Sequence, residues 1–154
     1  MSTTRTDATK LLEKDHREVE DLFEKFEKLT DRAKVSKKKI ADEICNELTV
    51  HTQVEEEIFY PAVRGAGKEM EDMIDEAIVE HASAKDLIAQ IQSMEADEEL
   101  YDAKVKVLQE QVEHHVEEEE KEMFPKVRKL GLDLDELGRQ MQERKEQLKA
   151  AMGA

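Results

Sequence analysis

Apolar side chains recur along this chain at intervals of three and four residues, which is the spacing that places them on one face of an α-helix. The apolar stripes predict four long helices, over residues 8–29, 36–60, 69–94 and 100–124. Asp7 or Thr9 can cap the first helix, and Pro61 is expected to end the second. Four long helices with short connections favour an all-α fold, an antiparallel up-down-up-down four-helix bundle.

A fifth, shorter helix is predicted after the bundle. It can be capped by Asp133 or Asp135 and extends to about residue 150, with a thin apolar edge that suits the outside of the bundle. The expected organisation is a flexible N-terminus at 1–7, the bundle at 8–128 and a C-terminal helical extension at 129–154.

Two similar segments interrupt the apolar stripes with polar residues. HTQVEEEIFYP begins at His51, and HVEEEEKEMFP begins at His115. In each copy a glutamate, Glu55 or Glu119, follows the histidine four residues later, so that both side chains lie on one helix face. An aromatic residue and a proline close each copy.

Two further histidines, His16 and His81, lie on the stripes of the first and third helices. They precede His51 and His115 by 35 and 34 residues. With a rise of about 1.5 Å per residue, the predicted helices bring all four imidazoles within about one turn of the same level in the bundle.

The carboxylates of Glu55 and Glu119 lie on apolar helix faces, where a negative charge needs a positively charged partner. Burying ionised Glu55 and Glu119 costs several kcal/mol each, and only Lys85 offers a nearby basic side chain. Two metal ions bridged by the carboxylates would remove this cost. A donor set of imidazole and carboxylate without thiolate suits non-haem iron best and leaves manganese and zinc open. The candidate ligands are His16, His51, Glu55, His81, His115 and Glu119.

The neighbouring polar residues have less direct roles. His114 lies about 100° around the helix from His115, which places it at the surface or behind the ligands. In the acidic run 117–120 only Glu119 is expected to contribute, the others being a solvated face. Glu56 is expected to face mainly solvent, with a metal within reach if the helix rotates, and Glu57 to lie on the surface.

These residues resemble the hemerythrin-like, or HHE cation-binding, domain over about residues 8–128. The resemblance rests on His16, His81 and the two His-x3-Glu pairs with their aromatic-Pro endings. It implies a four-helix bundle with a non-haem di-iron centre, in which two carboxylates, Glu55 and Glu119, and an oxo or hydroxo group bridge the irons. The six candidate ligands would be the metal ligands by that resemblance.

The chain departs from the oxygen-carrying hemerythrins at one position. Those proteins have a second histidine one turn after the first on the third helix, where this chain has Lys85. The additional donor would then be Glu20, Glu56, Tyr60, Tyr101 or solvent. A more open centre is expected to turn over peroxide or O2 rather than to hold O2 reversibly.

Four functions follow from these observations. The favoured one is a di-iron protein that binds, senses or reacts with O2, peroxide or nitric oxide, which includes a catalase-like enzyme. The alternative is an O2 or iron store or carrier without turnover. A ferritin-like centre needs two Glu-x-x-His motifs, and only Glu13-x-x-His16 is present. A metal-free interaction bundle is the remaining possibility.

The charge, the cysteine count and the apolar stretches of the chain limit which molecules it is expected to bind and where in the cell it is expected to act. The formal net charge of −15 disfavours nucleic acid and anionic membranes as partners. Cys45 is the single cysteine and is expected to be a buried, inert thiol. With neither a secretory signal nor an apolar stretch of membrane-spanning length, a cytoplasmic protein is expected. Its expected partners are a small diatomic or peroxide ligand and a redox partner protein, and the expected state is a monomer or weak oligomer.

Overall fold

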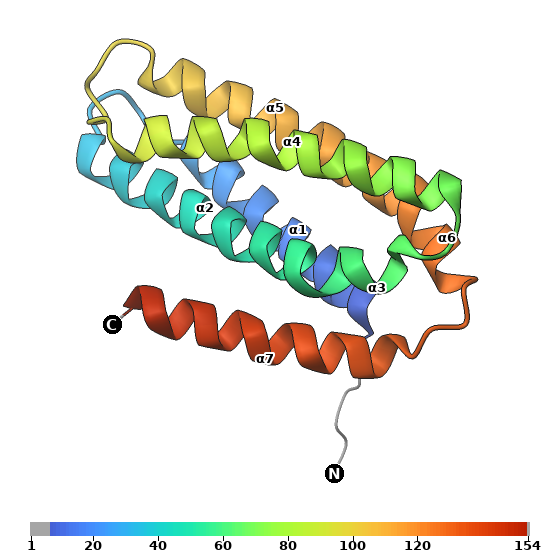
Figure 1. Cartoon of the computed structure of the whole chain (residues 1–154). Coiled ribbons are helices and arrows are strands. Elements are labelled where there is room, and N and C mark those ends of the chain that lie inside the picture. The colour runs from blue at the N-terminus through green and yellow to red at the C-terminus, as the bar shows by residue number, and fades with distance from the viewer. Residues whose placement is uncertain (1–6, 154) are drawn as a thin grey trace.

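The computed structural model describes residues 7–153, and every regular element in that part of the chain is helical (Figure 1). This confirms the predicted all-α class. The flexible segment predicted at 1–7 lies outside the described residues except for Asp7. The elements are α1 (Ala8–Glu27), α2 (Lys34–Val54), η1 (Glu55–Phe59), α3 (Tyr60–Arg64), α4 (Lys68–Gln92), α5 (Tyr101–Glu118), η2 (Glu119–Met123), α6 (Phe124–Arg128) and α7 (Leu134–Gly153).

Side-chain caps fix the starts of the first and last helices. Asp7 Oδ1 accepts a hydrogen bond from the Lys10 amide at 2.9 Å, which satisfies one of the free donors of the first turn of α1. Asp133 Oδ1 accepts from the Glu136 amide at 3.0 Å at the start of α7. Asp7 and Asp133 are therefore the residues that cap these helices.

The expectation that Pro61 ends the second helix is wrong. Here α2 continues through the π-helical turn η1 into α3, and it ends only at Arg64. In η1 the Tyr60 amide donates to the carbonyl of Glu55, five residues earlier. The wider turn lets Pro61, which lacks an amide donor, begin a new α-helical turn rather than break the helix.

The second copy of the segment repeats this geometry. The Phe124 amide donates to the carbonyl of Glu119, so η2 carries α5 into α6, and the helix ends at Arg128 rather than at the predicted Phe124. Each π-helical turn begins at one of the two repeated glutamates. Because π-helical turns occur often at functional sites, their position here singles out Glu55 and Glu119.

Apolar side chains form two separate core clusters with a polar layer between them. One cluster includes Leu12, Phe59 and Met141, and the other includes Phe23, Ile44 and Leu108. The buried histidines and glutamates belong to neither cluster. The apolar packing on both sides supplies the stability that allows a layer of buried polar groups in the centre.

The C-terminal helix α7 lies against one side of the helices that carry the layer (Figure 1). It packs on α1, α2 and η1, and it buries Gly138 and Met141 completely or nearly so. Few apolar residues point inward, as its thin apolar edge predicts. The helix is attached both by these apolar contacts and by ion pairs that Arg144, Lys145 and Lys149 make with other helices.

Candidate metal centre

The structure brings together the six side chains that the sequence singles out. All six are at most 9% exposed, and Glu55 and Glu119 are 0% and 1% exposed. The ring atoms Nε2 of the histidines face the carboxylate oxygens at 3.1–3.2 Å. The four histidines come from four different helices: His16 from α1, His51 from α2, His81 from α4 and His115 from α5.

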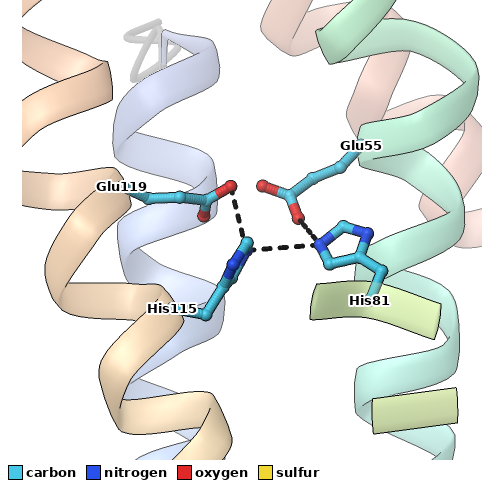
Figure 2. A group of neighbouring side chains, drawn as sticks. All are labelled: Glu55, His81, His115 and Glu119. Atoms are coloured by element: carbon cyan, nitrogen blue, oxygen red, sulfur yellow. Dashed lines mark hydrogen bonds and ion pairs between the residues drawn. The ribbon is translucent and has the colours of Figure 1, made fainter. Parts of the chain in front are cut away.

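The imidazoles form two pairs. The ring centroids of His16 and His51 are 5.0 Å apart, and those of His81 and His115 are 4.8 Å apart. Figure 2 shows the second pair, with both rings pointing toward the two carboxylates. The Nε2 atoms of this pair are 3.2 Å apart.

Each carboxylate lies between the two pairs. Glu55 Oε1 is 3.2 Å from Nε2 of His51 and 3.1 Å from Nε2 of His81. Glu119 is 3.2 Å from Nε2 of His16 through Oε1 and 3.2 Å from Nε2 of His115 through Oε2. Each glutamate thus contacts one imidazole of each pair, which is the placement that a bridging carboxylate needs.

The outward nitrogen of every imidazole donates to a further carboxylate. Nδ1 of His16 is 2.6 Å from Glu120 and Nδ1 of His51 is 2.9 Å from Asp15. Because an ionised carboxylate can only accept, Nδ1 carries a proton in both rings. When Nε2 gives up its own proton, its lone pair is directed at the centre.

The second pair of histidines is held in the same way. Nδ1 of His81 is 2.7 Å from Glu56, and Nδ1 of His115 is 2.6 Å from Glu80. Such carboxylate–histidine pairs are the usual support of metal-binding imidazoles, because they fix the ring and raise its basicity. All four imidazoles are therefore held with Nε2 toward the centre, the orientation that metal-binding imidazoles have.

Each supporting carboxylate also pairs with a basic side chain. Glu120 binds Arg17, Glu56 binds Lys85 at 2.8 Å, and Asp15 binds Lys145 at 2.5 Å. The fourth carboxylate, Glu80, lies 3.7 Å from His114. His114 is 68% exposed and also contacts Glu118, so it lies at the surface behind His115, as its helical position predicts.

Unpartnered polar atoms test whether this layer suits metal ions. Among residues 7–153, seven buried side-chain nitrogen or oxygen atoms make no hydrogen bond, and five of them belong to His16, His51, Glu55 and Glu119. Buried polar atoms are normally satisfied. Five such atoms around one point fit a site for positively charged ions, and an imidazole-carboxylate set without thiolate fits iron.

Within this buried layer, two groupings of ligand atoms are close enough to hold one ion each. One consists of Glu55, Glu119 and the pair His81 and His115; its atoms lie within 4.8 Å of one another. The other consists of Glu119 with the pair His16 and His51. Because Glu119 belongs to both and Glu55 also contacts His51, the arrangement suits two ions that share the carboxylates.

Of the residues considered as additional donors, only Tyr60 points into the centre. Its hydroxyl donates to Glu119 Oε2 at 2.6 Å and lies 3.3 Å from Nε2 of His81. Glu56 is turned to the outer nitrogen of His81 instead of the centre. Glu20 is 40% exposed and pairs with Arg17. Tyr101 lies in the apolar cluster of Phe23, Ile44 and Leu108.

The supporting carboxylates correct the expectation for the acidic runs. Glu56 and Glu120 were expected to face mainly solvent, yet they are 26% and 22% exposed and hold His81 and His16. Asp15 and Glu80 were not singled out at all. The signal for them was present: each directly precedes a histidine of the site, and Glu56 and Glu120 each directly follow one of the two repeated glutamates.

The buried charges shift the pKa values of the site in opposite directions. Burial alone would lower the pKa of the His51 imidazole, but Glu55 and Asp15 outweigh this effect and raise it to about 10. Neighbouring carboxylates raise the pKa of His16, His81 and His115 in the same way. In Asp15, burial is outweighed by His51 and Lys145, and the pKa falls to about 2.

These shifts predict how the stability of the metal-free protein depends on pH. Because the folded pKa of His51 is about 10 against about 6.5 unfolded, its contribution is complete below the unfolded value and is lost as the pH rises through the folded one. The free energy of unfolding is expected to fall between pH 6.5 and 10, which urea denaturation at pH 6 and pH 9.5 measures. A rise over this interval would contradict the assignment.

A small cavity borders the imidazoles. It has a volume of about 40 Å³ and is lined by all four histidines and by apolar side chains that include Val19, Ala84 and Val112. The small side chain of Ala84 leaves room at this point, as its place beside His81 on the stripe suggests. Neither Glu55 nor Glu119 lines the cavity, so a small molecule in it would meet the centre from the imidazole side.

A larger cleft of about 300 Å³ reaches the centre from another direction. It is lined by residues of α4, α5 and η2, among them His115 and Glu119, and by Lys126 of α6. Its other polar side chains are mainly carboxylates and include Glu76, Glu80 and Glu118. The acidic lining attracts cations.

The comparisons with known proteins identify the class to which this fold and centre belong. The family model of the hemerythrin HHE cation-binding domain matches residues 7–127. The chain belongs to this family, as the resemblance indicates, and it is a metal-binding hemerythrin-like protein.

Its relatives include mycobacterial proteins. Uncharacterized proteins of Mycobacterium bovis and of Mycobacterium tuberculosis, the latter Rv2633c, are each 31% identical over 113 residues, which span 71% of this chain and 68% of theirs. The crystal structure of a hemerythrin HHE cation-binding domain-containing protein from Mycobacterium kansasii, a homolog of Rv2633c, matches with a TM-score of 0.79 and 26% identity. The match covers 94% of this chain and 88% of that one.

The hydropathy of the helices shows whether any of them could cross a membrane. Within residues 7–153 none combines the length and the apolar character that crossing a membrane would require.

Proposed function

We propose that this protein is a di-iron protein that senses or reacts with O2, peroxide or nitric oxide. The observation that carries the proposal is the cavity of about 40 Å³ bordered by all four imidazoles. It has room for a diatomic molecule or one of similar size, and its remaining lining is mostly apolar. An apolar lining favours uncharged small molecules over ions.

The residues that would hold the irons are the six of the centre. His16 and His51 would bind one ion and His81 and His115 the other, with Glu55 and Glu119 shared between them, and an oxo or hydroxo group is the further bridge proposed. Two imidazoles and two shared carboxylates leave coordination positions open on each ion. Bound iron would supply Lewis acidity and electrons for redox chemistry.

The chain itself supplies positioning and a hydrogen-bond donor. The supporting carboxylates hold the imidazoles in one tautomer, so they need no rearrangement when a ligand arrives. Burial, with the charges of Glu119 and Glu55, raises the pKa of Tyr60 well above its usual value. The phenol therefore keeps its proton at neutral pH and holds it against Glu119 at 2.6 Å.

The proposal also covers the order of the helices, the cellular location and the redox partner. We propose an up-down-up-down order of the four ligand-bearing helices with α7 as an addition to the bundle, and action in the cytoplasm. A redox partner protein would restore the starting oxidation state. The chain has no suitable thiol of its own for this step among the described residues. Cys45 is buried and the pKa of its thiol is raised by burial to about 12, so this cysteine is a poor electron donor to the centre.

The test is reactivity of the iron-loaded protein. Protein reconstituted with Fe(II) without oxygen is exposed separately to air, hydrogen peroxide and nitric oxide, and absorbance and peroxide consumption are followed. A spectral change with peroxide consumption or with nitric oxide binding is expected. Iron-loaded protein that responds to none of the three would contradict the proposal, and a fully reversible change with oxygen alone would favour a carrier.

Replacing Tyr60 with phenylalanine tests the role of its proton. We expect Tyr60→Phe to bind iron like the unmodified protein but to consume peroxide more slowly by about 100-fold, which is typical of losing one positioned hydrogen-bond donor. Tyr101→Phe is the matched control, because the Tyr101 hydroxyl is buried away from the centre without a hydrogen bond. Equal rates in the two variants would contradict this role for Tyr60.

A further inference from the structure

The basic side chain behind His51 differs from the three behind the other imidazoles. Lys145 is only 11% exposed, whereas Arg17, Lys85 and His114 are 53%, 46% and 68% exposed. It also comes from α7, while the other three lie on the helices that carry the ligands. An ion pair in such a buried place is screened little by water or salt.

Lys145 and His51 each contact a different oxygen of the Asp15 carboxylate. Lys145 Nζ is 2.5 Å from Oδ1 of Asp15, and Nδ1 of His51 is 2.9 Å from Oδ2. Asp15 is 5% exposed, so water has little access to either oxygen. With Oδ1 held by Lys145, the carboxylate is fixed in the rotation that presents Oδ2 to His51.

A second ion pair holds α7 beside the centre. Arg144 Nε is 2.8 Å from Oε1 of Glu57 in η1, the π-helical turn that begins with Glu55. Met141, one turn earlier on α7, is fully buried. The contacts from Met141 to Lys145 thus attach α7 at the level of the ligands.

We propose that Lys145 is a positioning residue for the ion held by His16 and His51, and that α7 acts through it on how tightly that ion binds. The inference rests on the metal centre of the proposed function and not on its reaction. In the absence of the lysine, Asp15 would keep its buried charge and its hydrogen bond with His51, but Oδ1 would lose the partner that holds it. The carboxylate would then be free to turn away, and His51 would lose its fixed orientation.

The expected result of Lys145→Met is unequal binding of the two irons. Loss of a residue that supports a metal-binding imidazole typically weakens binding by about 10- to 100-fold. We expect one iron to be weakened by that factor and the other to be held as before, because His81 and His115 have supports of their own. Loss of the positive charge should also lower the reduction potential of the weakened ion.

The measurement is competition for Fe(II) between the protein and a chromogenic chelator without oxygen. Lys149→Met is the control: Lys149 also lies on α7, but it is 41% exposed and pairs with Glu47 of α2 at 3.0 Å. Lys145→Met should give one tight and one weak iron, whereas Lys149→Met and Lys145→Arg should give two tight irons. Two tight irons in Lys145→Met would overturn the inference.

A double-mutant cycle distinguishes two roles of Lys145: positioning of the Asp15 carboxylate, or only attachment of α7 to the other helices. If Lys145 acts through Asp15, then Lys145→Met should change the affinity of the weak iron much less in an Asp15→Asn background. Additive effects would overturn the inference and show that Lys145 only holds the helix. Should Lys145→Met not fold, Asp15→Asn alone is expected to weaken the same ion, and unchanged binding would overturn the inference equally.

The failure of the proposed function would look different. Protein without substitutions that binds no iron would contradict the metal centre itself. Protein that binds two irons but does not react with oxygen, peroxide or nitric oxide would contradict the proposed reactivity while leaving the role of Lys145 to the chelator experiment.

Discussion

Replacing Glu119 with glutamine is expected to lower the iron content from two ions per chain to at most one. The two oxygens of Glu119 face the imidazoles of His16 and His115, which belong to different pairs. A neutral amide of the same shape binds iron poorly and removes the negative charge that both ions would share. Elemental analysis after reconstitution with excess Fe(II) and desalting measures the effect.

Glu117 provides the matched control for this substitution. It stands two residues earlier in the same acidic run, is 65% exposed and pairs with Lys121 at 3.0 Å. Glu117→Gln is expected to retain two irons. Two irons in Glu119→Gln, or the same loss in both variants, would contradict the assignment of Glu119 as a shared ligand.

Removal of iron is expected to destabilise the protein strongly. A ligand that binds only the folded state adds about 4 kcal/mol when its free concentration is 1,000 times its Kd. For a chain of this size each kcal/mol shifts the Tm by about 2–4 °C, so that one ion held this tightly raises the Tm by roughly 10 °C. Thermal unfolding followed by circular dichroism without oxygen, with Fe(II) and after chelation, measures the difference.

Magnesium serves as the control for a general effect of cations on an acidic chain. With a net charge of −15, some non-specific stabilisation by any divalent ion is expected. Mg²⁺ prefers oxygen ligands and binds weakly to imidazole, so it should raise the Tm far less than Fe(II) at the same concentration. Equal effects of the two ions would indicate surface screening rather than binding at the centre.

The central features of the fold were predictable because they depend on local spacing. The stripes of apolar residues placed the ends of the four long helices to within two residues, except where the second and fourth helices continue to Arg64 and Arg128. The same spacing brought His51 beside Glu55 and His115 beside Glu119, and the rise per residue brought the four histidines to one level. The family resemblance is confirmed by the match of the hemerythrin HHE cation-binding domain over residues 7–127.

The helix ends after the repeated segments were not predictable from these rules. A proline normally ends a helix, and Pro61 was expected to do so. The π-helical turn at Glu55–Phe59 removes the conflict, but a π-helical turn has no periodic pattern of its own in the sequence. Its position directly at Glu55 and at Glu119 becomes visible only in three dimensions.

Contacts between distant parts of the chain account for the other missed features. Glu120 holds His16 from a position 104 residues away, and Lys145 reaches Asp15 across 130 residues. Hydrophobic periodicity carries no information on such pairs. The acidic runs therefore looked like solvated faces, although Glu56 and Glu120 are oriented toward histidines of the centre.

The most direct test of the account is an anomalous-difference map at the iron absorption edge from crystals of the reconstituted protein. Two peaks are predicted, one beside Nε2 of His16 and His51 and the other beside Nε2 of His81 and His115, with Glu55 and Glu119 reaching both. The absence of iron from this layer of side chains, or a single peak at the surface, would contradict the metal centre described here.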